Sequence, residues 1–128
     1  MGVYDATCAP TPMGELLART GSICGTSPAF TWVGDQFLVD RGVNAWMGQR
    51  SLPLWLPDPE YAGYGCWDVS ASLASGLTIR AVEETAADAL AWERQLGLDR
   101  QRRAGVTAAE ETSLLSEWRR GSARAGRW

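Results

Sequence analysis

Residues 68–96, DVSASLASGLTIRAVEETAADALAWERQL, carry the clearest structural pattern in the chain. Apolar residues recur at helical spacing over residues 82–96, which predicts one long helix there. The predicted apolar stripe consists of Val82, Ala86, Ala89, Leu90 and Leu96. Glu83 and Glu84 open this helix and Arg94 lies near its end, an order that complements the helix dipole.

Shorter elements are expected on both sides of this helix. Further helices are predicted at residues 12–20, 35–41, 68–76 and 107–120. Short strands are predicted at residues 2–7, 29–33 and 77–80, which are β-branched, aromatic or alternating. The expected helix ends are marked by capping residues: Thr11, Asp35 and Asp68 as N-caps, and Gly21, Gly42 and Gly76 as closing glycines. Thr107 and Glu110 form a capping-box pattern.

These elements predict a simple division of the chain. Residues 1–96 are expected to form the main structural segment, and the charged residues 97–106 a linker. Residues 107–120 are expected to form a terminal helix and residues 121–128 a flexible tail. No internal repeat accompanies this division.

Length and composition indicate one ordinary globular unit. The chain has 128 residues, of which 45% are hydrophobic and 21% charged. It contains no apolar run long enough for a membrane-spanning helix, and its first residues lack the features of a signal peptide. We therefore expect no membrane association and a cytoplasmic location.

The charge is modestly acidic and unevenly distributed. The formal net charge of −3 argues against general binding of nucleic acid or anionic membrane. Residues 1–99 carry 5 Arg against 12 acidic residues, whereas residues 100–128 carry 7 Arg against 3. We interpret the Arg-rich end as a solvated terminus, with contact to nucleic acid as the alternative.

Two absent residue types exclude several reaction mechanisms. The sequence contains no His, and all 12 of its basic residues are Arg. A Ser-His-Asp triad, a Schiff-base Lys, a P-loop Lys and a His-ligated zinc are therefore impossible within this chain. Arg stays protonated and cannot act as a general base.

The cysteines are too few and too irregularly spaced for a disulfide framework or a zinc site. Cys8, Cys24 and Cys66 are odd in number and contain no CxxC pair. Free thiols in a reducing compartment fit this pattern best. We expect inert cysteines, with a nucleophilic role as the alternative.

Residues 43–67, VNAWMGQRSLPLWLPDPEYAGYGCW, form the candidate binding segment. Pro and Gly are frequent here, and long irregular segments in small domains are often binding loops. The aromatic residues of the segment are Trp46, Trp55, Tyr61, Tyr64 and Trp67. Such side chains suit an apolar pocket or a platform for sugar stacking, and the alternative is that they pack the loop onto the helices.

Charged residues supply weaker candidates. Arg50 and Arg80 would grip a carboxylate or phosphate of a ligand, or else form surface ion pairs. The acidic pairs Asp58/Glu60 and Glu83/Glu84 are interpreted as a solvated turn and a helix start, because nothing in the sequence brings them together in a cleft. No metal site is predicted.

Several segments together resemble the C-terminal part of an extended short-chain dehydrogenase/reductase of the NAD-dependent epimerase/dehydratase superfamily. The opening GVYDATCAPTPMGELLART resembles a late strand and helix of that family, and FTWVGDQFLVDRGV resembles a following strand-helix pair. WDVSASLASGLTIRAVEETAADALAWERQ is the strongest match, and GVTAAEETSLLSEW resembles a terminal helix. The resemblance spans nearly all of residues 2–118.

The resemblance implies a part of an enzyme rather than a whole one. Family members carry a nucleotide-binding GxxGxxG turn and a catalytic YxxxK pair, and this sequence contains neither. The implied fold is α/β, or α+β in isolation: a helix-dominated C-terminal segment of a Rossmann-type epimerase/dehydratase fold with few short strands. The nucleotide-binding half is expected to be absent, with no catalytic or cofactor-binding residue in this chain; NAD or NADP is expected for the full-length family.

The leading functional hypothesis is a substrate-binding portion acting on a small organic substrate. Its predicted substrate-binding residues are Trp46, Trp55, Tyr64, Trp67 and Arg80. The alternatives are a stand-alone ligand- or protein-binding module that uses residues 43–67, and a non-functional truncated remnant. Because the expected strands and apolar helix faces would lack their partners, we also expect marginal stability or self-association.

Overall fold

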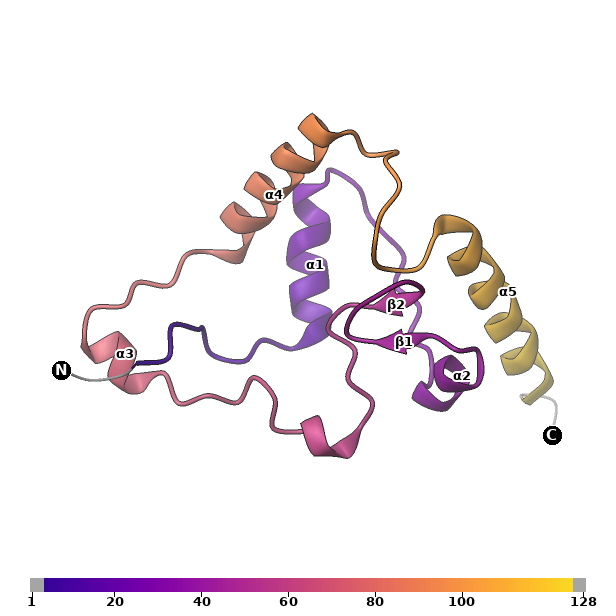
Figure 1. Cartoon of the computed structure of the whole chain (residues 1–128), viewed down its shortest axis with the longest axis horizontal. Helices are drawn as coiled ribbons and strands as arrows, with labels where there is room; N and C mark the ends of the chain where they lie inside the picture. Colours follow the sequence, from indigo (N-terminus) through magenta and orange to yellow (C-terminus); the bar gives the residue numbers. More distant parts are fainter. Residues whose placement is uncertain (1–3, 126–128) are drawn as a thin grey trace. The chain divides into compact units, whose positions relative to one another are not determined.

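The structure, a computed structural model that describes residues 4–125 and side chains through Ser122, is rich in helix and has two short strands (Figure 1). Its helices are α1 (Met13–Ile23), α2 (Asp35–Asp40), the 3-10 turn η1 (Pro59–Tyr61), α3 (Ser70–Ala74), α4 (Val82–Leu96) and α5 (Ala108–Ala125). The strands are β1 (Asn44–Ala45) and β2 (Ser51–Leu52). Within the described residues, no helix is both long and apolar enough to cross a membrane.

The chain divides into two compact units that interleave in sequence. Unit 1 contains Met1–Ala29 and Gly63–Arg100, and therefore α1, α3 and α4. Unit 2 contains Phe30–Ala62 and Gln101–Trp128, and therefore α2, both strands, η1 and α5. Each unit is described separately below.

The strand predictions were wrong. Described residues 4–7, 29–33 and 77–80 contain no strand; residues 2 and 3 of the first prediction lie outside the described part. β-Branched and aromatic composition favours a strand only where a neighbour supplies the hydrogen-bonding partner, and these segments have none.

The observed strands lie instead in the segment predicted to be irregular. β1 and β2 pair in parallel, with Asn44 opposite Ser51 and Ala45 opposite Leu52. Parallel neighbours normally need a long crossover connection, but only residues 46–50 join these two. The reversal is achieved by left-handed backbone at Trp46, Gly48 and Arg50, with φ of 67°, 91° and 50°.

Helix α1 starts near the expected position but ends later. Pro12, not Thr11, is the N-cap, and no side chain caps this end. Gly21, predicted to close the helix, is a buried residue inside its last turn. The chain turns at Gly25, whose φ of 68° suits a residue without a Cβ atom. The end of α1 was therefore predicted one turn too early, because glycines at positions 21 and 25 could both end a helix.

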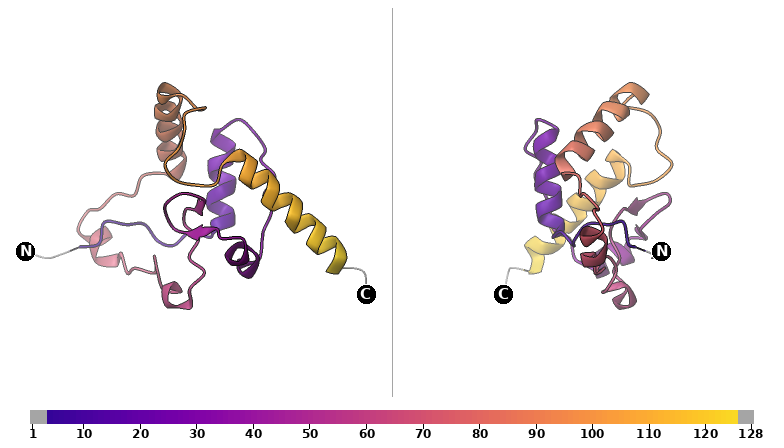
Figure 2. Two further views of the ribbon diagram at one scale, coloured as in Figure 1. Left: turned by 45° about the vertical axis from the view of Figure 1, so that its right-hand side comes forward. Right: turned by 90° about the vertical axis from the view of Figure 1, so that its left-hand side faces the viewer.

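Unit 1 is built on the packing of α1 against α4, which lie side by side in Figures 1 and 2. The predicted bounds of α4 are confirmed. Its predicted apolar stripe is only partly correct: Val82, Ala86 and Leu90 are half-buried, whereas Ala89 and Leu96 are exposed. Helix α4 therefore uses one face toward α1 and leaves a second apolar face open.

A bidentate ion pair ties the two helices of unit 1 together. Arg19 of α1 donates from Nε to Glu83 Oε1 at 2.6 Å and from Nη2 to Glu83 Oε2 at 2.8 Å. This parallel arrangement matches the fork of a guanidinium to a carboxylate. The pairing lowers the pKa of Glu83 to about 2, chiefly through the hydrogen bond from Arg19.

Helix α3 is shorter than the predicted 68–76; its closing glycine, Gly76, is confirmed, but Val69 and not the predicted Asp68 is the N-cap. Asp68 Oδ1 accepts a hydrogen bond from the Ser70 backbone N–H at 2.9 Å. Gly76 adopts φ of 98°, and the next N–H, that of Leu77, donates to the Ser72 carbonyl at 3.0 Å. The buried hydroxyl of Ser72 donates to the Asp5 carbonyl at 2.6 Å, which fixes the N-terminal segment against this helix.

The core of unit 2 forms where α2 ends. Gly42, with φ of 63°, closes α2 as predicted, while Gly34 takes the N-cap position that was assigned to Asp35. The Val43 N–H donates to the Leu38 carbonyl at 3.0 Å, the hydrogen bond of a Schellman motif. That motif brings together the side chains of Leu38 and Val43, which with Leu114 of α5 make the buried cluster.

Helix α5 begins as predicted and continues further. Thr107 and Glu110 exchange hydrogen bonds, with Thr107 N–H to Glu110 Oε2 at 2.8 Å and Glu110 N–H to Thr107 Oγ1 at 3.2 Å, which confirms the capping box. The helix ends at Ala125, so residues 121–125 are helical and not a loose tail. Residues 126–128 of the predicted tail lie outside the described residues.

The buried apolar core is small throughout the described residues. It consists of Leu38, Val43, Val69 and Leu114. The accessible surface is 9981 Å². A folded protein of this mass exposes about 6,700 Å², and two separate units of half the mass about 8,000 Å².

Candidate functional site

The predicted site residues fall into two groups, one in each unit. Trp46 and Trp55 belong to unit 2, whereas Tyr64, Trp67 and Arg80 belong to unit 1. The candidate binding segment 43–67 therefore crosses the boundary between Ala62 and Gly63. Each group is a separate candidate surface with its own geometry.

Trp46 and Trp55 are linked through their backbones. The Trp46 N–H donates to the Trp55 carbonyl at 3.2 Å, directly after β1. The indole N–H of Trp55 donates to Asp35 Oδ1 at 2.9 Å, and its ring packs against the Leu38–Val43–Leu114 cluster. Both tryptophans are half-buried. For Trp55 the structure therefore favours the alternative to ligand binding, namely that its ring packs the loop onto the helices.

Tyr64 and Trp67 are displayed more openly. They are 56% and 53% exposed and lie in a segment with no helix or strand, between η1 and α3. A turn closed by the Cys66 N–H on the Gly63 carbonyl at 3.1 Å lies between them, and Gly65 within it has φ of 86°. Large aromatic side chains exposed to this degree present broad apolar faces to a ligand.

Arg80 is engaged by carboxylates of its own chain. Its Nε donates to Glu84 Oε2 at 3.2 Å, and its Nη2 donates to Asp88 Oδ2. These hydrogen bonds, that of Asp88 first, raise the pKa of Arg80. A ligand carboxylate or phosphate would have to compete with two acidic side chains of α4 for this guanidinium.

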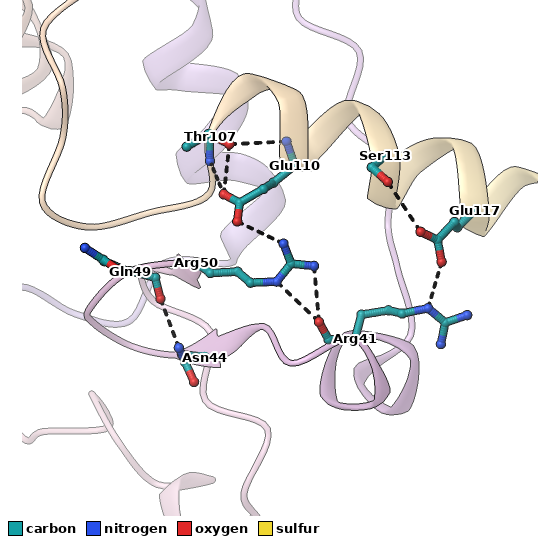
Figure 3. A network of polar contacts seen from close by, with 8 residues as sticks. All are labelled: Arg41, Asn44, Gln49, Arg50, Thr107, Glu110, Ser113 and Glu117. Carbon is teal, nitrogen blue, oxygen red and sulfur yellow. Dashed lines mark hydrogen bonds and ion pairs between the residues drawn. The ribbon is translucent and has the colours of Figure 1, made fainter.

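Arg50 joins two helix ends in unit 2 (Figure 3). Its Nη1 donates to Glu110 Oε1 at 2.9 Å, while Nε and Nη2 donate to the Arg41 carbonyl at 3.3 and 3.2 Å. The guanidinium thus binds both the carbonyl at the partially negative C-terminal end of α2 and the capping-box carboxylate of α5. Arg50 was expected either to bind a ligand carboxylate or phosphate or to form an ion pair, and the structure supports the ion pair.

A second arginine, Arg41, also links α2 to α5, at a more C-terminal position of α5. Arg41 Nε donates to Glu117 Oε2 at 2.8 Å, and its guanidinium lies 4.6 Å from the centre of the Phe37 ring. Phe37 meets Trp118 edge to face at 5.2 Å. The hydrogen bond from Arg41 lowers the pKa of Glu117. This combination of cation–π contact, ion pair and aromatic pair stabilises unit 2.

Ser51 is a structural residue that the sequence did not reveal. Its side chain is fully buried, its hydroxyl donates to the Gly48 carbonyl at 2.6 Å, and it accepts from the Gly105 N–H at 3.2 Å. These bonds connect the strand turn to the segment that precedes α5. No local pattern marks this serine, because its second partner is 54 residues away in sequence.

Several carboxyl groups are held in their ionised form by hydrogen bonds within the chain. Four carboxyl groups have a pKa that departs from its ordinary value: Asp68, Glu83, Glu110 and Glu117. All four shifts are downward and arise first from hydrogen bonds. A lowered pKa keeps a carboxylate ionised and makes it a poor proton donor at neutral pH.

Residues 4–125 form no assembled site for binding a metal ion or for thiol chemistry. Within that range no group of three or more cysteine or acidic side chains is placed to hold a metal ion. Cys8, Cys24 and Cys66 are exposed free thiols. Of the predicted aromatic site residues, Tyr64 and Trp67 are the ones that the structure leaves exposed.

Comparison with known proteins does not add a relative. No family model, curated protein sequence or solved structure matches the chain.

Proposed function

We propose that this chain is the substrate-binding portion of an NAD(P)-dependent reductase, epimerase or dehydratase of Rossmann type, and that it is not catalytically competent alone. Its role is to hold a small organic substrate while a nucleotide-binding part outside this sequence supplies the cofactor and the hydride step. We place it in the reducing cytoplasm, in keeping with three free thiols. No nucleic acid or membrane is expected among its partners.

The observation that carries the proposal is the open display of Tyr64 and Trp67. Both rings are more than half exposed in a segment that has no helix or strand of its own. The sequence supplies no GxxGxxG turn, YxxxK pair, His or Lys with which to catalyse the reaction alone.

Ligand titration followed by NMR tests this role. The sequence contains seven Trp residues, so seven indole N–H signals are available as reporters. We expect methyl β-glucoside, as a sugar probe, or acetophenone, as an aromatic ketone probe, to shift the Trp67 indole signal in a saturable way. Trp32→Leu is the matched control, because Trp32 is also exposed but lies outside segment 43–67. Tyr64→Leu, which removes the other exposed ring of this surface, should abolish this shift of the Trp67 signal, and Trp32→Leu should leave it intact; equal loss in both would contradict the proposal.

The second candidate is a stand-alone binding module that uses residues 43–67. It is favoured by the Trp46–Trp55 pair, which forms in unit 2 without any contribution from outside the chain. The coding sequence upstream of Met1 distinguishes the two. An in-frame GxxGxxG and YxxxK there would support the enzyme part, and a promoter with a ribosome-binding site directly before Met1 would support the module or, without any ligand, a non-functional remnant.

A further inference from the structure

The Arg-rich end of the chain plays no part in the proposed binding function. Residues 118–128, WRRGSARAGRW, contain four Arg and no acidic residue. Ser122 lies among them, with Arg119 three residues and Arg120 two residues before it. No other Ser or Thr of the sequence has Arg at both of these positions. One hydroxyl after two cations is a pattern that an enzyme with an acidic substrate groove recognises.

The hydroxyl of Ser122 is accessible in the structure. Ser122, Arg119 and Arg120 are all exposed on α5. Within the described residues the Ser122 hydroxyl makes no hydrogen bond, whereas Ser113 and Ser116, the other two serines of α5, each donate one within the helix. Neither Arg119 nor Arg120 forms an ion pair with a described carboxylate. A change at Ser122 therefore breaks no described contact.

Helix α5 is anchored to unit 2 only as far as Trp118. Glu117 accepts a hydrogen bond from Arg41 at 2.8 Å (Figure 3), and the Trp118 ring packs on an aromatic ring of α2 at 5.2 Å. Among the described residues, no hydrogen bond, ion pair or ring contact joins residues 119–122 to another element. A Cβ atom on Gly121 would meet nothing within 4 Å, and glycine inside a helix costs about 1 kcal/mol relative to alanine. The last turn of α5 can therefore unwind while the rest of the helix keeps its packing.

Together these features describe a substrate for a protein kinase. We propose that Ser122 is phosphorylated by a serine kinase that recognises Arg119 and Arg120 through acidic side chains of its substrate groove. The Ser122 Oγ forms a bond to the γ-phosphorus of ATP, and the bond between that phosphorus and the oxygen of the β-phosphate breaks. The hydroxyl proton goes to the catalytic Asp of the kinase, and ADP leaves.

The modification changes the charge of this end of the chain. A phosphoserine carries about −1.5 to −2 charges at neutral pH. The four Arg of residues 118–128 supply four positive side-chain charges, so phosphorylation removes about half of the net positive charge there. On the helix the phosphate lies three residues after Arg119, a spacing at which opposite charges pair.

Phosphate transfer to the purified full chain tests the site. The probe is the catalytic subunit of cAMP-dependent protein kinase, an Arg-directed serine kinase, with radiolabelled MgATP. We expect a single phosphate per chain, which peptide mass spectrometry places on Ser122. Ser122→Ala should abolish incorporation. Ser22→Ala is the matched control and should leave it unchanged, because Ser22 is also exposed and follows Arg19 by three residues but lacks the second Arg.

Substitution of arginine separates recognition of the motif from mere exposure of a serine. Arg120→Gln should lower kcat/KM for phosphorylation at least ~10-fold, because a hydrogen bond between charged groups is lost. Arg103→Gln removes another exposed Arg of unit 2 and should leave kcat/KM unchanged. Circular dichroism checks that both variants keep their helix content. No phosphate on Ser122, phosphate mainly on another residue, or equal kcat/KM for the two Arg variants would overturn the proposal.

Discussion

Replacing Leu114 by Ala should remove a substantial part of the stability of unit 2. Leu114 is 8% exposed and forms the buried cluster with Leu38 and Val43, so it supplies one of only three buried apolar side chains there. Leu-to-Ala changes in cores cost about 2–5 kcal/mol, and we expect about 2–3 kcal/mol because the half-buried neighbours can partly close the cavity. A unit of about 60 residues has about 3–9 kcal/mol in all.

The assay is thermal and urea unfolding, followed by circular dichroism and by the indole N–H signals. At about 4–8 °C per kcal/mol, the midpoint of unit 2 should fall by about 8–24 °C. Trp55 and Trp118 report on unit 2, and Trp92 reports on unit 1. Leu115→Ala is the matched control, because it removes the same atoms from a half-buried position of the same helix. A loss below 1 kcal/mol for Leu114→Ala, or an equal loss for Leu115→Ala, would refute the assignment of the core.

Two smaller changes probe polar contacts. Because the folded-state pKa of Glu83 is lowered from 4.5 to about 2, its ion pair with Arg19 stabilises unit 1 above pH 4.5 and is lost as the pH falls toward 2. Glu83→Gln should therefore be less stable than wild type at pH 7, and the difference in unfolding midpoint should vanish near pH 2; a difference independent of pH would contradict the pairing. Ser51→Ala should lower the stability of unit 2 by about 1 kcal/mol in urea unfolding, because the Gly48 carbonyl and the Gly105 N–H lose the hydroxyl and keep their hydrogen bond to each other at 3.1 Å. An unchanged midpoint would contradict the stabilising role of this hydroxyl.

Local sequence signals located the helices of this chain well. The bounds of α4, the capping box of Thr107 and Glu110, and the closing glycines Gly42 and Gly76 all involve residues within a few positions of one another. Such interactions are readable because the same short segment contains both partners. At the end of α1 the prediction placed the closing glycine at Gly21, and it was wrong because the chain turns at Gly25.

The strands could not be predicted because their pairing is not determined within a single short segment. A strand exists only through its partner, and residues 29–33 and 77–80 have none in the described structure. β1 and β2 form because Trp46 and Arg50 adopt left-handed backbone, which neither side chain favours. Contacts from elsewhere in the chain, such as those of Arg50 with Glu110 and the Arg41 carbonyl, hold that conformation.

The aromatic residues of the candidate site could be located from the sequence, but their arrangement could not. Aromatic enrichment drew attention to Tyr64 and Trp67 in segment 43–67, whose rings are more than half exposed, and their role in binding stays a prediction. The division of the segment between two units could not be read from it, since the boundary depends on contacts with residues 101–128. Arg50 and Glu110 were each singled out, but their ion pair spans 60 residues and leaves no local pattern.

The central claim is that this chain binds substrate but carries no cofactor site or catalytic machinery of its own. Calorimetric titration of NADH and NADPH into the purified chain tests it most directly. We expect no measurable binding of either nucleotide up to about 1 mM, because the sequence offers no glycine-rich turn to bring backbone N–H groups to a pyrophosphate. Micromolar affinity for either nucleotide would contradict the account and would require a cofactor site among residues that we assign to substrate.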